Sequence, residues 1–254
     1  MIYISAIGMI NALGNDTDEI ATNLTRGVAP GMRPRPGWLQ GHPQAVLAGV
    51  DGELPAIPDD FAAHRSRNNQ LLLAALAQIQ PRVDEAIAQY GRDRVAVVLG
   101  TSTSGLDEGD AHVNLTLNGQ ESLSWQYPQQ ELGDPSRFLS HWLALDGPAF
   151  TLSTACSSSA RAIISGRRLI EAGLADVAIV GGADTLSRMP INGFHSLESL
   201  SPTRCLPFGR DRSGITIGEG AALMLLTREP QPVALLGVGE SSDAYHISAP
   251  HPQG

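Results

Sequence analysis

Several short runs of β-branched and other apolar residues stand out along the chain. Residues 2–9 form the first run and residues 94–99 form the second. A continuous apolar run predicts a strand that is buried on both faces of its sheet, because a half-exposed strand alternates apolar with polar residues. Further runs predict strands at 45–50, 150–154, 177–180, 221–227 and 232–238.

Apolar residues at helical spacing separate many of these runs. A first helix is expected to begin at Asn15 or Thr17 as its N-cap. Residues 67–91 carry Leu, Ala and Ile at helical spacing, and Pro81 predicts that this run divides into two helices. Further helices are expected at 134–145 and at 157–172.

Two segments show no such pattern. Residues 27–64 hold six prolines and predict a loop around the short strand at 45–50. Residues 101–133 are polar, with scattered glycines and no clear period. Strands that alternate with helices elsewhere predict the α/β class, with a sheet covered by helices on both faces. No low-complexity linker interrupts the chain, so one domain is expected over residues 1–254.

Composition and charge exclude several classes of protein. The 254 residues are 42% hydrophobic and 17% charged, which favours a folded core over disorder. The formal net charge of −9 argues against a nucleic-acid partner, because a phosphate backbone requires a basic face. No signal peptide and no apolar run long enough for a membrane span is visible, so a cytoplasmic protein is expected.

The segment around Cys156 is the strongest candidate for chemistry. A predicted strand runs into a turn of small residues, and a predicted helix begins at once, which places Cys156 at a helix N-terminus. Unpaired N–H groups and the helix dipole favour a thiolate there, and a thiolate is the nucleophile of acyl transfer. The backbone N–H of Cys156 is a candidate oxyanion donor. The alternative is that Cys156 is a small buried residue. Cys205 has no such context and is expected to be structural.

Other motifs favour no second chemistry. Gly181–Gly182 lacks the spacing of a dinucleotide loop, and Gly214, Gly218 and Gly220 lack that of a phosphate loop. No His, Cys and Asp cluster has the spacing of metal ligands, so neither a metal nor a cofactor is expected. The adjacent acids Asp59–Asp60 and Asp107–Glu108 are interpreted as solvated loop charges.

Five segments in order resemble those of β-ketoacyl-acyl-carrier-protein synthases. TACSSS resembles the nucleophile turn of that family, and VAIVGGAD resembles its strand with a Gly-Gly-Ala-acidic turn. The other three are VLGTSTSGLD (98–107), LPFGRDRSGITIGEGAALMLL (206–226) and VGESSDAYHISAP (238–250).

The resemblance implies a thiolase-like fold of five αβαβα layers built from two similar halves. It implies a two-step acyltransferase reaction: an acyl group moves from acyl carrier protein to Cys156 and then condenses with a decarboxylating malonyl-carrier protein. By the same resemblance Phe194 lies near the acyl pocket, Thr103 stands where a bulky aliphatic residue often limits chain length, and Asp243 and His246 lie near the active-site loops. A homodimer is also implied, with the 150–154 strand or its neighbours near the two-fold axis.

The chain departs from the family pattern in several places. Gly209, Ser213 and Ile215 replace residues that the family usually has as Asp, Asp and Phe. Glu198 stands where a basic residue often receives the acidic carrier protein. Arg65 and Arg67 form a small basic spot that either receives this partner or is an ordinary helix start. Together with Thr103, the departures predict a specialised branch of the family rather than the housekeeping enzyme of fatty-acid biosynthesis; the pathway, whether fatty acid, polyketide or polyene, stays open.

The resemblance also places two catalytic histidines and a lysine in the second half of the fold, after the segment that ends near residue 250. Residues 1–254 are therefore expected to be the N-terminal portion and to be inactive alone in condensation. Two alternatives stay open: a non-catalytic thiolase-fold half that serves in dimerisation or binding, and a cysteine acyl-hydrolase. Chain-length partner subunits usually lack the cysteine, so Cys156 argues against that class.

Overall fold

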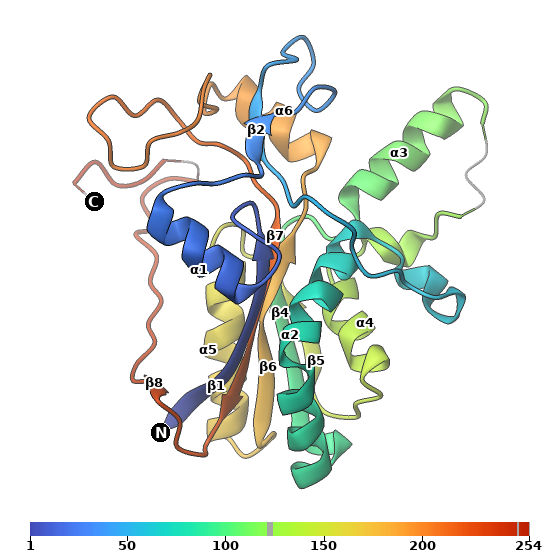
Figure 1. Ribbon diagram of the computed structural model, residues 1–254, viewed down its shortest axis with the longest axis vertical. Helices are drawn as coiled ribbons and strands as arrows, with labels where there is room; N and C mark the ends of the chain where they lie inside the picture. Colours follow the sequence, from blue (N-terminus) through green and yellow to red (C-terminus); the bar gives the residue numbers. More distant parts are fainter. Residues whose placement is uncertain (121–123, 248, 254) are drawn as a thin grey trace.

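The computed structural model describes residues 1–120, 124–247 and 249–253, and it has a central sheet with helices on both faces (Figure 1). The strands are β1 (Ile2–Asn11), β2 (Met32–Pro34), β3 (Val46–Ala48), β4 (Val95–Gly100), β5 (Ala149–Leu152), β6 (Val177–Asp184), β7 (Gly220–Thr227) and β8 (Val233–Leu235). The α-helices are α1 (Thr17–Arg26), α2 (Arg67–Tyr90), α3 (Leu106–Leu117), α4 (Asp134–Trp142), α5 (Ser158–Glu171) and α6 (Arg188–Ser196). Short 3-10 helices cover Asp59–His64, Arg92–Arg94 and Tyr127–Gln130.

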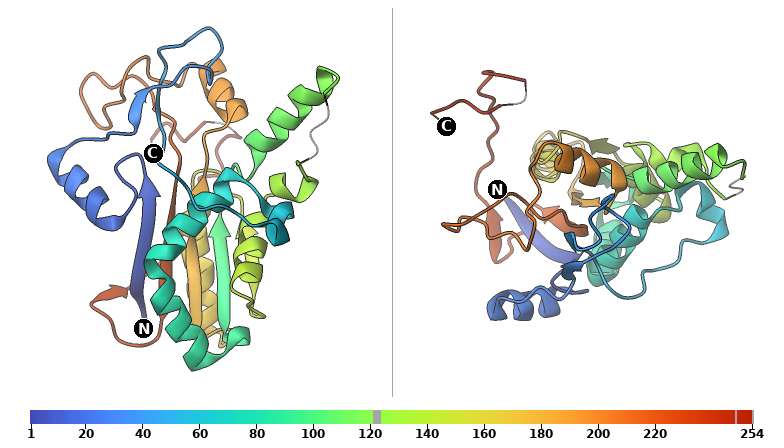
Figure 2. Two further views of the ribbon diagram at one scale, coloured as in Figure 1. Left: turned by 45° about the vertical axis from the view of Figure 1, so that its right-hand side comes forward. Right: turned by 90° about the horizontal axis from the view of Figure 1, so that it is seen from above.

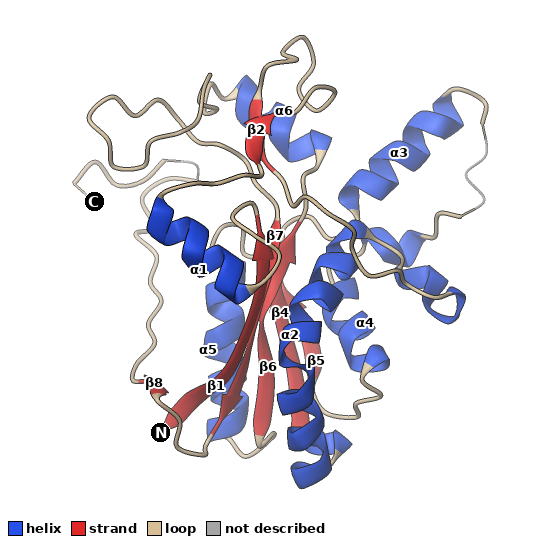
Figure 3. Ribbon diagram, viewed as in Figure 1, coloured by secondary structure: helices blue, strands red, loops and turns tan. Residues whose placement is uncertain are grey.

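The central sheet is mixed, and it contains the strands predicted at 150–154, 177–180 and 221–227. Its strand order is β5-β4-β6-β7-β1-β8 (Figure 3). β4 lies parallel to β5 and β6, whereas β7 lies antiparallel to β6 and β1. β5 therefore forms one edge of the sheet, and the carboxyl ends of β4 and β6 meet at the same end.

Two helices bury the sheet from opposite sides. α2 packs Leu72, Leu76 and Ile79 into one core with β4 and β6 residues, and α5 packs Ala162 and Ile170 into another. These contacts explain why the central strands are apolar without alternation, since both of their faces are buried. On other parts of α5, Ile164 is buried, and Arg161 and Arg168 pair with Glu240 of the segment after β8.

α2 is one continuous helix, and the predicted break at Pro81 is wrong. Pro81 is exposed within the helix, while Ile79, Val83 and Ala86 continue the buried stripe across it. Proline removes one backbone hydrogen bond from a helix interior. Burial of the apolar stripe on both sides of Pro81 outweighs that loss.

The start of α1 also differs from the expectation. Asp16, rather than Asn15 or Thr17, is the N-cap, and its carboxylate accepts hydrogen bonds from the backbone N–H groups of Asp18 and Glu19. Glu19 in turn accepts a hydrogen bond from the backbone N–H of Asn15. This reciprocal pair satisfies N–H groups at the helix start that have no partner within the helix.

The polar pattern concealed three elements. α3 lies within the segment 101–133, and Gly109 is its only buried residue among those described, so no apolar stripe marks it. α6 likewise buries Ile191 alone among its residues. The short strand predicted at 45–50 is β3, and it pairs with the unpredicted β2.

A small lobe lies beyond the carboxyl ends of β4 and β6. It consists of the β2–β3 hairpin and α6, which meet at the top of the molecule (Figure 2). Leu39, Leu47, Leu186 and Ile191 form its core. The side chain of Asn192 donates to the Trp38 carbonyl oxygen and fastens α6 to the hairpin.

Candidate active site

Cys156 lies in the turn between β5 and α5, close to the helix start that the sequence predicts. α5 begins at Ser158 with Ser157 as its N-cap residue. The Cys156 side chain is exposed, which contradicts its interpretation as a small buried residue. Cys205 is half-buried in the loop after α6, and its backbone N–H donates to Thr216 Oγ1.

The backbone of the turn is held in an uncommon conformation. Ala155 has a φ of 53°, in the left-handed region that residues with a Cβ rarely adopt. Its carbonyl oxygen accepts hydrogen bonds from Ser158 Oγ at 2.6 Å and from Ser102 Oγ at 3.2 Å. Ser158 Oγ also accepts a hydrogen bond from the Thr154 backbone N–H at 2.8 Å. The hydroxyl groups thus fix the backbone immediately before Cys156.

Two glycines allow the start of α5 to lie directly against the sheet. A Cβ added to Gly100 would lie 2.4 Å from the Ser158 carbonyl carbon and the Ser159 nitrogen. A Cβ added to Gly182 would lie 2.3 Å from Ser159 Oγ. Any side chain at either position would push the helix start away from the ends of β4 and β6.

Thr103 belongs to the loop of residues 101–104, which follows β4. Its side chain is buried, and its hydroxyl group donates to Asp184 Oδ1 at 3.0 Å and accepts from the Thr185 backbone N–H at 3.0 Å. Ser102 of the same loop reaches the turn that carries Cys156, because its hydroxyl group donates to the Ala155 carbonyl oxygen. The structure therefore connects Thr103 to the surroundings of Cys156 through this loop.

A shallow hollow lies beside the start of α5. Its volume is about 250 Å³. The residues that line it come from β1, α5, β6 and β7, and they include Asn11, Ser159, Gly182 and Asp184. The lining of this hollow thus combines mostly small side chains with one carboxylate.

The other predicted site residues lie elsewhere. Phe194 is half-buried in α6 of the upper lobe. Asp243 and His246 belong to the segment after β8, which extends away from the sheet (Figure 2). Backbone N–H groups of Tyr245 and then His251 donate to Asp243 and hold the pKa of its carboxyl below the usual value. The placement of Phe194 near the acyl pocket, and of Asp243 and His246 near the active-site loops, stays a prediction.

The basic spot predicted at the start of α2 is occupied by internal ion pairs. Arg65 pairs with Asp59 at 2.7 Å, and Arg67 pairs with the buried Glu219 at 2.6 Å. The Glu219 carboxylate raises the pKa of Arg67. Both guanidinium groups are thus already neutralised within the chain, which favours the interpretation as an ordinary helix start.

The interpretation of Asp107–Glu108 as solvated charges is wrong. Asp107 pairs with Arg188 at 2.9 Å. Glu108 is largely buried, accepts a hydrogen bond from the Arg67 backbone N–H, and has a carboxyl pKa that burial raises. Asp107 and Glu108 lie in the first turn of α3. Because this helix was not predicted, nothing in the sequence pattern indicated their contacts.

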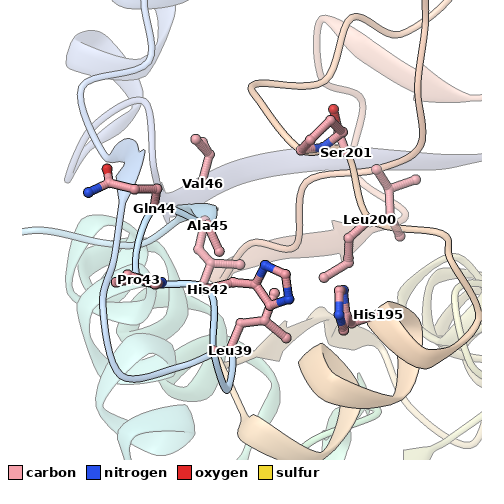
Figure 4. A pocket seen from close by; sticks show the side chains of 13 residues that line it. Leu39, His42, Pro43, Gln44, Ala45, Val46, His195, Leu200 and Ser201 are labelled. Carbon is pink, nitrogen blue, oxygen red and sulfur yellow. The ribbon is translucent and has the colours of Figure 1, made fainter.

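A separate cavity of about 340 Å³ lies in the upper lobe (Figure 4). Apolar side chains such as Leu39, Val46 and Leu200 line it, together with His42 and His195. The two imidazole rings meet edge to face, with ring centroids 4.6 Å apart. Cys156 does not line this cavity, so it is not part of the candidate site.

The described residues favour neither a metal site nor a membrane span. No group of three or more His, Cys, Asp or Glu side chains among residues 1–120, 124–247 and 249–253 could hold a metal ion. Within the same part of the chain, no helix is long and apolar enough to cross a membrane.

The sequence analysis included Asp184 and Ser102 in segments that resemble the family, but it assigned neither residue a role. Asp184 is the last residue of β6, and Ser102 follows β4, which lies beside β6 in the sheet. Because the carboxyl ends of adjacent parallel strands meet at one edge, polar residues directly after each strand are expected to come together. Polar residues after two predicted strands were therefore the signal that could have found this contact.

Comparison with known proteins agrees with this geometry. The family model described as the N-terminal domain of beta-ketoacyl synthase matches residues 1–231. Nodulation protein E of Rhizobium meliloti (strain 1021) is 29% identical over 268 residues, which cover 98% of this chain and 65% of that protein. The 3-oxoacyl-[acyl-carrier-protein] synthase 2 of Staphylococcus aureus (strain COL) is 26% identical over 275 residues, which cover 100% of this chain and 66% of that protein.

A solved structure is much more similar. The complex of a ketosynthase with its chain length factor from Xenorhabdus doucetiae contains a chain that is 70% identical, with a TM-score of 0.96. The match covers 100% of this chain and 64% of that one, so this chain spans slightly less than two thirds of its relative. The predicted thiolase-like α/β fold is thereby confirmed.

Proposed function

The chain belongs to the β-ketoacyl synthase family, and from that premise we propose that Cys156 accepts an acyl group from an acyl carrier protein. The observation that carries this proposal is the exposed thiol on a strained turn at the start of α5. Gly100 and Gly182 bring that helix start against the sheet, and small side chains surround the thiol. This arrangement exposes a nucleophile to a bulky thioester.

The acylation step exchanges one thioester for another. The Cys156 thiolate attacks the carbonyl carbon of the acyl-phosphopantetheine thioester, and a new C–S bond forms. The bond from that carbon to the pantetheine sulfur breaks, and the departing thiolate takes up a proton. A tetrahedral oxyanion develops between the two events, and a backbone N–H at the start of α5 is the proposed donor to it.

The second step is a decarboxylative Claisen condensation with a malonyl-carrier protein. Loss of carbon dioxide leaves an enolate, whose carbon attacks the Cys156 acyl group and releases the cysteine thiolate. Both the enolate and the oxyanion require hydrogen-bond donors. By family resemblance these are histidines of the second half of the fold, so we propose condensation for the complete enzyme and not for residues 1–254 alone.

A second thiolase-fold subunit is the proposed partner besides the carrier protein. In the similar structure from Xenorhabdus doucetiae, a ketosynthase forms a complex with its chain length factor. The free edge of β5, with Phe150 39% exposed, supports an interface at this position. We therefore propose a pair of such subunits, either with a chain-length partner or as a homodimer. A cytoplasmic location agrees with carrier-protein substrates.

Mass spectrometry after incubation with an acyl-carrier-protein thioester tests the nucleophile assignment. We expect one acyl adduct on Cys156 and none in Cys156→Ala, while Cys205→Ala keeps the adduct. Equal labelling of wild type and Cys156→Ala would contradict the proposal. Release of free fatty acid without an accumulating adduct would favour the acyl-hydrolase alternative, and an absence of both would favour a non-catalytic module.

A further inference from the structure

Asp184 concentrates hydrogen bonds from the loop of residues 101–104 on one oxygen atom. Its Oδ1 accepts from the Ser102 backbone N–H at 2.7 Å and from the Thr103 backbone N–H at 3.0 Å. The hydroxyl groups of Thr103 and Thr101 donate to the same oxygen at 3.0 and 3.2 Å. A carboxylate accepts such bonds about twice as strongly as a neutral oxygen.

The loop that Asp184 holds has a strained backbone of its own. Ser104 has a φ of 44°, and its backbone N–H donates to Thr101 Oγ1 at 2.9 Å. Left-handed backbone costs about 1–2 kcal/mol for a residue with a Cβ and persists only where surrounding contacts determine it. The bonds to Asp184 are contacts of this kind.

Ser102 transmits this constraint to the nucleophile turn. While its N–H is bound to Asp184, its hydroxyl group donates to the carbonyl oxygen of Ala155. Ala155 has the other left-handed backbone of the site and directly precedes Cys156. A continuous set of hydrogen bonds therefore leads from the end of β6, through the loop after β4, to the residue before the nucleophile.

We propose that Asp184 is a positioning residue, which acts through Ser102 to set the orientation of the Cys156 thiol. This inference rests on the proposed role of Cys156 as the acyl acceptor. Asp184 is not expected to react with substrate. Its contribution is to keep the thiol and the N–H groups at the start of α5 aligned on one thioester carbonyl, which is the alignment that acyl transfer requires.

The test compares Asp184→Asn, Ser102→Ala, Ser102→Thr and the Asp184→Asn/Ser102→Ala double variant in the purified protein. We expect acylation of Cys156 at saturating acyl carrier protein to slow by about tenfold or more in Asp184→Asn and Ser102→Ala. The half-saturating carrier concentration should stay close to that of wild type, because the network orients the thiol and does not bind the carrier. Ser102→Thr keeps the hydroxyl group and should recover much of the rate.

The double variant shows whether the two residues act in series. Its rate should match that of the slower single variant, because residues that act through one another are not additive. Thr25→Ala is the matched control, since Thr25 also donates its hydroxyl to a backbone carbonyl, Ala21, but in the distant α1. It should acylate at the wild-type rate.

Two results would overturn the proposal: a wild-type rate in Asp184→Asn, or losses that multiply in the double variant. If Asp184→Asn does not fold, Ser102→Ala with its Thr counterpart decides the question. Iodoacetamide labelling of Cys156 relative to Cys205 separates this proposal from the proposed function, because alkylation needs no carrier protein. A changed labelling ratio in a protein that never takes up an acyl group would support positioning and reject acyl transfer.

Discussion

The buried Glu219 connects three separate parts of the chain through hydrogen bonds. Its carboxylate accepts two hydrogen bonds from the Arg67 guanidinium and one each from the backbone N–H groups of Val50 and Leu186. These partners belong to α2, to the segment after β3 and to the segment before α6. Loss of the carboxylate would leave a partly buried cation and two backbone donors without a partner.

We therefore expect Glu219→Ala to lower the free energy of unfolding by about 3–5 kcal/mol, the usual cost of breaking a buried ion pair. Glu85→Ala removes the exposed pair between Arg82 and Glu85 and should cost about 1 kcal/mol or less. Urea unfolding of both variants measures the difference. Similar losses in the two would show that burial does not strengthen the Arg67–Glu219 contact.

Glu108 makes stability depend on pH in the direction opposite to that of a typical surface carboxylate. Burial raises its pKa in the folded state, so the folded protein holds this proton at pH values where the unfolded chain has released it. The contribution of Glu108 to the free energy of unfolding is greatest below the carboxyl pKa of the unfolded chain. This contribution is lost as the pH rises through the raised pKa of the folded protein.

Glu108→Gln removes the charge and keeps an oxygen that can accept from the Arg67 N–H. We expect this variant to be more stable than wild type near neutral pH and to approach wild-type stability near pH 4. Thermal unfolding across that pH range tests whether Glu108→Gln is the more stable protein near neutral pH, and Glu53→Gln serves as the exposed control. A gain that is constant with pH would show that ionisation of Glu108 is not its cause.

At the scale of elements, the approach of α5 to the sheet depends on Gly166. A Cβ at this position would lie 2.2 Å from Val180 Cγ1 of β6. Gly193 in α6 has no atom within 4 Å of an added Cβ. Both glycines lie inside helices, so intrinsic helix propensity alone would favour alanine at each by about 1 kcal/mol.

The two alanine variants should therefore change stability in opposite directions. Gly166→Ala should destabilise by about 1–3 kcal/mol, because the overpacked helix must move away from β6. Gly193→Ala should stabilise by about 0.5–1 kcal/mol. Chemical unfolding of the two variants measures both changes in the free energy of unfolding. Stabilisation by Gly166→Ala would show that α5 can move away from β6 without loss of stability.

The same elements show why only part of the fold could be predicted. Strands β4 and β6 were found because burial on both faces makes them continuous apolar runs. β1 and β7 were also found from apolar runs, although both strands are only partly buried. α3 and α6 were missed because each buries a single residue and so shows no apolar stripe. The predicted helix break at Pro81 was wrong because packing of the apolar stripe outweighs the helix-breaking tendency of proline. The position of Cys156 on a strand-to-helix turn was predicted from the local pattern, and the structure has it between β5 and α5. The contact of Asp184 with Ser102 joins residues 82 positions apart, which no local pattern encodes.

At the scale of the whole molecule, the exposed edge of β5 is the feature that favours association with a second subunit. Within the part of the chain that the structure describes, β5 pairs with β4 alone, so one side of its backbone N–H and C=O groups has no strand partner in the sheet. Unpaired edges of this kind are templates for pairing with a second chain. Phe150, opposite Val98 in the β4–β5 register, adds an exposed aromatic side chain to this edge.

We expect Phe150→Asp to weaken the pairing of this chain with a second thiolase-fold subunit, because a buried aromatic residue becomes a charge that the interface must desolvate. A loss of about 2 kcal/mol or more, typical of a central aromatic residue, corresponds to roughly thirtyfold weaker association. Native mass spectrometry of the protein produced alone and with a chain-length-factor subunit measures this loss. Leu24→Asp, on the exposed side of α1, should leave association unchanged. Assembly of Phe150→Asp at wild-type strength would place the interface on another face, whereas a loss only in the sample with the second subunit would identify the partner as the chain-length type.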